Sequence, residues 1–238
     1  MNESPPIAFA YLLVGTLAVS AVSAVSAGMA AMLLPKGARM HRLCGRLFTF
    51  CMLLLCVSGI YLSLTRSILF TLLLSVLALH AVLSGWAAAS RISDWQRRAE
   101  RIGLVLIGGN AFSAAAGGIA VLANDGGVID ELPAATFFAV AGVSALLGLL
   151  DYAWIRREQR PLRRRIARHL SRMGFAMFIA TAIFFIGNSD VFPAALRTVP
   201  ILVALAVVVL TLGWLGYVLL AGPDRLRHTT AAGHAADR

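Results

Sequence analysis

The chain has 238 residues, of which 59% are hydrophobic and 13% are charged, and its mean hydropathy is +0.82. A soluble domain of this size cannot bury so much apolar surface, so the composition argues against a water-soluble enzyme and indicates an integral membrane protein. The net charge is +10, but the basic residues lie between apolar runs, which favours membrane topology over nucleic-acid binding.

The amino-terminal segment does not resemble a cleaved signal peptide. Residues Met1–Pro6 carry Glu3 and no basic residue, whereas the first part of a signal peptide is basic. The apolar run from Ile7 to Leu34 is also too long for the core of a signal peptide. We therefore expect this segment to be retained as the first membrane span, beginning after two prolines that suit a helix start.

Seven apolar segments are long enough to cross about 30 Å of hydrocarbon, which takes about 20 residues. They are Ile7–Leu34, Leu47–Thr65, Ser67–Ser90, Ala99–Ala123, Pro133–Ile155, His169–Asn188 and Arg197–Ala221. All should be helices, because a helix satisfies its own backbone polar groups in lipid. The sequence predicts an all-α bundle forming one transmembrane domain over residues 1–222, followed by a polar, disordered tail over residues 223–238.

The basic residues predict the orientation of this bundle. With seven spans, 19 of the 21 basic residues fall on one side of the membrane, and only Arg66 and Arg197 fall on the other. Basic residues collect on the cytoplasmic side. We therefore expect the amino terminus outside, and the carboxyl terminus and the polar tail in the cytoplasm, with the bundle in the inner (plasma) membrane of the cell.

Two stretches at the predicted cytoplasmic face combine His, Arg and Gly at an expected helix start. One runs from Lys36 to Arg46 and the other from His169 to Gly174. A helix start has free N–H groups and the positive end of the helix dipole, and added arginines make it an anion site. The candidates for binding an anionic ligand or a lipid head group are His41, Arg42, Gly45, Arg46, Asp151, His169 and Arg172. The competing interpretation is that these arginines only mark topology and contact bulk lipid.

Polar residues inside the predicted spans form a second group of candidates. His80 lies about 13 Å from the inner end of the third span at 1.5 Å per residue, and an ionisable residue at such depth indicates a functional or a hydrogen-bonding role. Asn110 is expected to form a hydrogen bond across helices. Asp151, near the inner end of the fifth span, needs a cationic partner. We expect that partner to be His169, Arg172, Arg42 or Arg46.

Small residues at four-residue steps predict close helix packing in two spans. The first span carries Ser20, Ala24 and Gly28, and the fourth carries Gly109, Ser113 and Gly117 beside Gly108 and Gly118.

Several motifs together resemble a family of bacterial predicted membrane proteins with a domain of unknown function. They are the KGxxxHRxxGR run from Lys36 to Arg46, Gly85-Trp86 with Asp94-Trp95, Asp151 before a basic loop, the HxxRM run from His169 to Met173, Asn188 and Pro200. The resemblance covers roughly residues 35–188. Similar members carry Arg after the Gly-Trp pair, where this chain has Ala87. The resemblance implies a multi-span fold and a bacterial source, and no activity.

Three functions remain open at this stage. The first is a small transporter or lipid-associated protein with an anionic site at the cytoplasmic face, with anionic lipids as partners and no cofactor. The second is a b-type haem oxidoreductase with His41 and His169 as the haem ligands. The third is a non-catalytic accessory or scaffold protein with a protein partner or a second copy of itself. Motifs for nucleotide binding, serine hydrolysis and zinc proteolysis are missing, so the sequence favours a protein that is not an enzyme.

Overall fold

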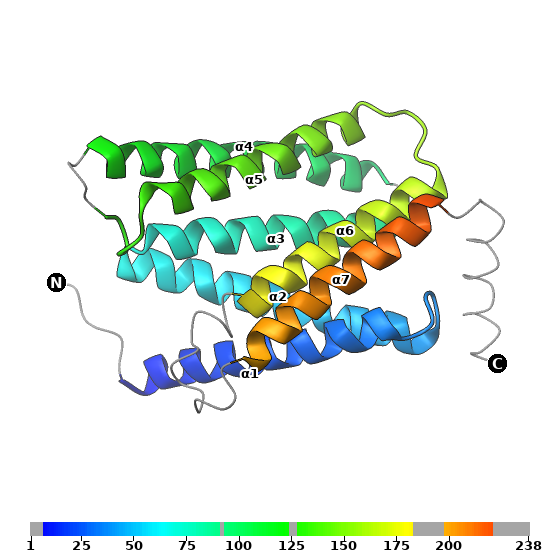
Figure 1. Ribbon diagram of the computed structural model, residues 1–238, viewed down its shortest axis with the longest axis horizontal. Helices are drawn as coiled ribbons and strands as arrows, with labels where there is room; N and C mark the ends of the chain where they lie inside the picture. The colour runs from blue at the N-terminus through cyan, green and yellow to red at the C-terminus, as the bar shows by residue number, and fades with distance from the viewer. Residues whose placement is uncertain (1–6, 91–92, 124–127, 183–197, 221–238) are drawn as a thin grey trace. The chain divides into compact units, whose positions relative to one another are not determined.

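The computed structural model describes residues 7–90, 93–123, 128–182 and 198–220, and these residues form seven helices (Figure 1). The helices are α1 (Ile7–Leu33), α2 (Arg39–Arg66), α3 (Leu69–Ala89), α4 (Asp94–Ala123), α5 (Ala134–Ile155), α6 (Leu162–Thr181) and α7 (Val199–Leu220). The predicted all-α architecture is confirmed for the described residues. Several predicted segments lie outside the described residues. They are residues 1–6, the part of the predicted sixth span after residue 182, and the tail from residue 221.

Six of the seven helices are long and apolar enough to cross a membrane: α1, α2, α3, α4, α5 and α7. Only 17–39% of the apolar window in each is buried inside the protein, and large side chains such as Val105 and Phe112 are 75% and 76% exposed. Contiguous apolar surface of this extent is not stable in water. The chain is therefore a multi-pass helical membrane protein.

The helix α6 begins earlier than the apolar pattern predicts. Its first residue is Leu162 rather than His169, and Pro161 accepts a hydrogen bond from the Arg165 N–H, as expected for a proline at a helix start. Arginine is a good helix former, so the basic turn ahead of the apolar run is helical. His169 is consequently the eighth residue of α6, and the expectation that it lies at a helix start is wrong.

The chain divides into two compact units, which are described separately. Unit 1 comprises residues 1–58 and 173–238, and unit 2 comprises residues 59–172. In unit 1, α1 packs closely through the small residues that the sequence predicted. Ser20 and Ala24 are buried, and a Cβ at Gly28 would lie 2.7 Å from the Met177 sulfur and 3.0 Å from the Phe48 ring.

Unit 2 is built around α3, α4 and α5, which pack side by side (Figure 1). Asn110 of α4 donates a 3.0 Å hydrogen bond to the Ser144 hydroxyl of α5, and both residues are buried. The predicted hydrogen bond of Asn110 across helices is confirmed. Gly117 and Gly118 lie against the rings of Phe137 and Phe138.

The predicted small-residue stripe of α4 is only partly a packing surface. A Cβ at Gly109 would have no neighbour within 4 Å, and Ser113 is exposed. The α4 face that packs on α5 runs through Asn110 and Gly117 instead, because α5 crosses α4 on that side. Within unit 2, Gly109 and Ser113 pack against no other described helix, so close packing at these two positions stays a prediction.

On α4, Gly117 packs against neighbouring side chains and Gly109 does not. We therefore expect the same substitution to have different effects at the two positions. Gly117→Leu should destabilise the protein by about 1–3 kcal/mol, because the new side chain overpacks a filled contact. A Cβ at Gly117 would already lie 3.1 Å from Phe137 and from Leu69. Gly109→Leu should leave the melting temperature in detergent unchanged or higher, since a helical glycine is itself destabilising. Equal melting temperatures of the two variants would contradict this assignment of the α4 faces.

The turn between α4 and α5 is attached to the start of α3. The Asp130 carboxylate accepts a 2.6 Å hydrogen bond from the Phe70 N–H, which is one of the N–H groups that a helix cannot satisfy internally. Asp130 and Glu131 have φ values of 54° and 61°, in the left-handed region that non-glycine residues rarely adopt. The turn is thus held in an uncommon conformation that places Asp130 over the first turn of α3.

Candidate functional site

A buried charged cluster in unit 2 contains residues from three helices: His80 of α3, Asp151 of α5, and Arg168 and Arg172 of α6. Arg168 and Arg172 are four residues apart and so share one face of α6. Asp151 lies one turn before the end of α5. Asp151, Arg172 and His80 are 2%, 3% and 7% exposed. The four side chains are called the Asp151 cluster below.

Asp151 is the common partner of the three basic side chains. Its Oδ1 lies 2.9 Å from Arg168 Nη2 and also accepts a hydrogen bond from Arg172 Nη2. Its Oδ2 lies 2.7 Å from His80 Nε2. This is a close contact between the two atoms, but the N–H direction of Nε2 is not aligned for a hydrogen bond. The predicted partner Arg172 is confirmed. Arg168 and His80 are partners that sequence reasoning missed.

The positive charge of the Asp151 cluster is not balanced. Two guanidinium groups face one carboxylate, so the cluster carries one excess positive charge even when His80 is neutral. Arg172 Nη2 also donates to the Leu147 carbonyl at 3.2 Å, but Arg172 Nη1 is buried and has no hydrogen-bond partner among the residues that the structure describes. A buried donor without a partner costs about 1–3 kcal/mol, and the cost is removed when an acceptor binds.

A second ion pair stands next to the Asp151 cluster. Both oxygens of Glu100 on α4 accept hydrogen bonds from Arg160, each at 3.0 Å, and Glu100 also accepts a 3.1 Å bond from the Trp154 indole. Arg160 and Arg168 lie over the Trp154 ring at 4.8 and 4.9 Å from its centroid. Trp154 therefore links the Glu100 pair to the Asp151 cluster.

Residues of α6 also satisfy the carbonyl groups at the end of α3. His169 Nδ1 lies 2.9 Å from the Gly85 carbonyl, and Arg165 donates to the carbonyls of Ala88, at 3.2 Å, and of Ser90. The last carbonyls of a helix have no partner within it, so these contacts fix the start of α6 against the end of α3. His169 binds this helix end, whereas Asp151 binds its neighbours on α6, Arg168 and Arg172.

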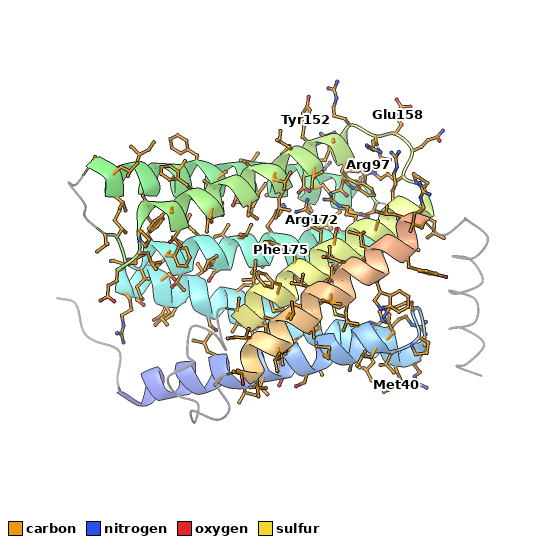
Figure 2. The ribbon with its side chains drawn as sticks, viewed as in Figure 1. Met40, Arg97, Tyr152, Glu158, Arg172 and Phe175 are labelled. Carbon is orange, nitrogen blue, oxygen red and sulfur yellow. The ribbon has the colours of Figure 1, made fainter. Side chains whose placement is uncertain are left out.

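The Arg-rich segments of unit 2 thus gather at one end, where α3 and α5 finish and α4 and α6 begin. Figure 2 shows Tyr152 and Glu158 pointing outward there, whereas Arg172 lies inside the helices. Both Tyr152 and Glu158 are exposed. The cationic side chains at this end therefore have two environments, an exposed one at the loops and a buried one at the Asp151 cluster.

The Lys36–Arg46 motif lies in unit 1 and holds the turn between α1 and α2. Lys36 Nζ donates to the carbonyls of Ala31, Leu34 and Met32 and lies 4.4 Å from the centroid of the Trp214 ring. Burial lowers the pKa of Lys36 to about 8, so its ammonium group remains charged at neutral pH. The cation compensates the negative end of the α1 dipole.

The other residues of the motif lie in the first turns of α2, which begins at Arg39. His41 Nδ1 lies 2.9 Å from the Ala31 carbonyl, and Arg42 donates to the Gly37 carbonyl. Arg46 is exposed, and a Cβ at Gly45 would have no neighbour within 4 Å. Because His41 belongs to unit 1 and His169 to unit 2, the haem site with these two ligands stays a prediction, as does pairing of Asp151 with Arg42 or Arg46.

Comparison with known proteins identifies no relative: no family model, no curated protein and no solved structure matches the chain. Within the described residues, no group of three His, Cys, Asp or Glu side chains is placed to hold a metal ion. The Asp151 cluster, with its geometry and its excess positive charge, is therefore the feature of the molecule that bears most directly on function.

Proposed function

We propose that this multi-pass membrane protein binds a phosphate group beside Arg172, either on the head group of an anionic lipid or on a small phosphorylated solute. The observation that carries the proposal is the buried Nη1 of Arg172, which has no partner in a cluster with one excess positive charge. An anionic oxygen would accept the free hydrogen bond and balance the charge, and guanidinium groups bind phosphate strongly.

The surroundings of the cluster favour a ligand that reaches it from the membrane surface. Arg97, Arg164 and other arginines at the same end of unit 2 are exposed and attract anions over about 10 Å at ordinary ionic strength. The charge distribution of the chain supports placing this end in the cytoplasm, in a bacterial inner membrane, where anionic lipids are available.

The test measures lipid binding to the purified protein in a neutral detergent. Native mass spectrometry and thermal unfolding are recorded with phosphatidylglycerol, phosphatidylcholine and inorganic phosphate. Phosphatidylglycerol should bind and raise the melting temperature, phosphatidylcholine should not, and an effect of inorganic phosphate would identify a soluble ligand. Arg172→Gln should weaken binding about tenfold or more, since it removes a hydrogen bond to a charged group.

Two further variants make the result specific to Arg172. Arg66→Gln removes the same charge from an exposed position at the end of α2 and should bind as the wild type does. Arg172→Lys keeps the charge opposite Asp151 but lacks the second guanidinium nitrogen, so it should also bind phosphatidylglycerol weakly. If Arg172→Gln does not fold, Arg172→Lys tests the role of Arg172 in its place. Undiminished binding by Arg172→Lys would overturn the proposal. An absorption spectrum with a Soret band would favour the haem alternative, and a co-purifying protein without lipid would favour the accessory role.

A further inference from the structure

We infer that the Asp151 cluster takes a proton as a second ligand, bound at His80, and that this proton and the phosphate group strengthen each other's binding. The inference rests on the proposed phosphate site. It adds the coupled ion and the residue that holds it.

The contact between His80 and Asp151 determines which ring nitrogen changes its protonation. A nitrogen lone pair and a carboxylate oxygen repel each other, so an approach of 2.7 Å between His80 Nε2 and Asp151 Oδ2 indicates that Nε2 carries a proton, even though this N–H is not aligned on Oδ2. Nε2 is therefore the protonated nitrogen of the neutral ring. The charge of His80 depends on whether Nδ1 takes a second proton.

The Nδ1 side of the ring faces a glycine of α4. A Cβ at Gly103 of α4 would lie 3.5 Å from both Nδ1 and Cε1 of His80. Every larger residue at this position would place a side chain against the ring edge that must take up the proton. Gly103 thus brings no side chain of its own against the Nδ1 edge of this buried histidine.

The charged groups around His80 make its protonation dependent on the anion. The ring faces Asp151 of α5. The Asp151 carboxylate is also bound by Arg168 and Arg172 of α6. On α4 the ring faces Gly103, and Glu100, about one turn before Gly103, is bound to Arg160. Without a ligand the net charge beside the ring is positive, which opposes protonation. A bound phosphodiester brings this charge to zero, so protonation of His80 becomes favourable.

The coupling is reciprocal by thermodynamic necessity. Anion binding promotes proton uptake at His80, and the protonated cluster, with a second excess positive charge, binds the anion more tightly. Histidine is the side chain whose charge changes between about pH 5 and pH 8. The site would therefore take up its anion together with a proton.

The experiment is isothermal titration of the full-length protein in detergent with a short-chain phosphatidylglycerol. The charge of this phosphodiester is constant across the pH range used. Repeating the titration in buffers with different ionisation enthalpies gives the number of protons taken up on binding. The wild type should take up protons near neutral pH, and its affinity should fall about tenfold from about pH 5.5 to about pH 8.5, a coupling within the usual range.

Two variants locate the proton. His80→Gln keeps a hydrogen-bond donor for Asp151 but cannot be protonated, so it should bind the lipid with no proton uptake and no dependence on pH. Gly103→Ala keeps His80 and places a methyl group beside Nδ1, so it should reduce proton uptake. Gly109→Ala, on the same helix and with no neighbour within 4 Å, should behave as the wild type.

The outcomes separate the two proposals. If the wild type does not bind phosphatidylglycerol, the phosphate site is wrong and the proton site fails with it. If the lipid binds without proton uptake, or if His80→Gln takes up protons as the wild type does, the phosphate site stands and the inference about His80 is overturned. Should His80→Gln not fold, proton uptake by Gly103→Ala equal to that of Gly109→Ala overturns it instead.

Discussion

Replacing Asp151 with leucine is expected to lower the free energy of unfolding by about 3–5 kcal/mol, the usual cost of removing one partner of a buried ion pair. Asp151 is the carboxylate that accepts from both Arg168 and Arg172 and contacts His80. Without it, two guanidinium groups are left in an apolar surrounding with no counter-charge. Unfolding in mixed detergent, followed by circular dichroism, measures the loss.

Two variants test whether the loss comes from the uncompensated charge. Glu158→Gln changes the net charge by the same amount at an exposed position and should leave stability unchanged within about 0.5 kcal/mol. The double variant Asp151→Leu, Arg172→Met should recover part of the stability, because a buried ion pair replaced by apolar residues is often neutral. Asp151→Leu with wild-type stability would show that the cluster contributes little to the fold.

The second large effect is expected for Glu100→Ala, which should destabilise the protein by about 3 kcal/mol or more. The side chains of Glu100 and Arg160 are only 5% and 6% exposed, and the substitution removes three hydrogen bonds at once, two from Arg160 and one from Trp154. Thermal unfolding measures the effect, and Glu158→Ala is the matched control. Hydrogen exchange should also rise in the segment between α5 and α6, where Arg160 lies. An unchanged melting temperature together with unchanged exchange there would contradict the prediction.

Much of the fold could be predicted because the bilayer imposes simple rules. Apolar runs of sufficient length had to be helices, and the described helices coincide with six of the seven predicted spans to within a few residues at most ends. The exceptions are the starts of α2 and α4, which extend into basic turns that hydropathy does not recognise as helical. The same limit explains why α6 starts earlier than hydropathy predicts. Pro161 is the residue in the sequence that indicates this earlier helix start.

The error at α6 also concealed part of the site. If the helix started at His169, Arg168 would lie in the preceding loop, outside the helix face that carries Arg172. Once α6 starts at Leu162, the four-residue spacing places Arg168 and Arg172 on one face, so both reach Asp151. The remaining partners could not be derived from the sequence. His80 and Glu100 join their ion pairs only because α3 and α4 pack against α5, which periodicity does not reveal.

The hydrogen bond from Phe70 to Asp130 has a consequence for how unit 2 is made in the cell. The two residues are 60 positions apart, which corresponds to roughly 3–12 s of translation at 5–20 residues per second. During this interval the first turn of α3 has been synthesised while its capping carboxylate has not. The Phe70 end of α3 therefore closes only after the turn before α5 has been made, and a nascent chain stalled before Asp130 should hold α3 in the membrane with that end still open.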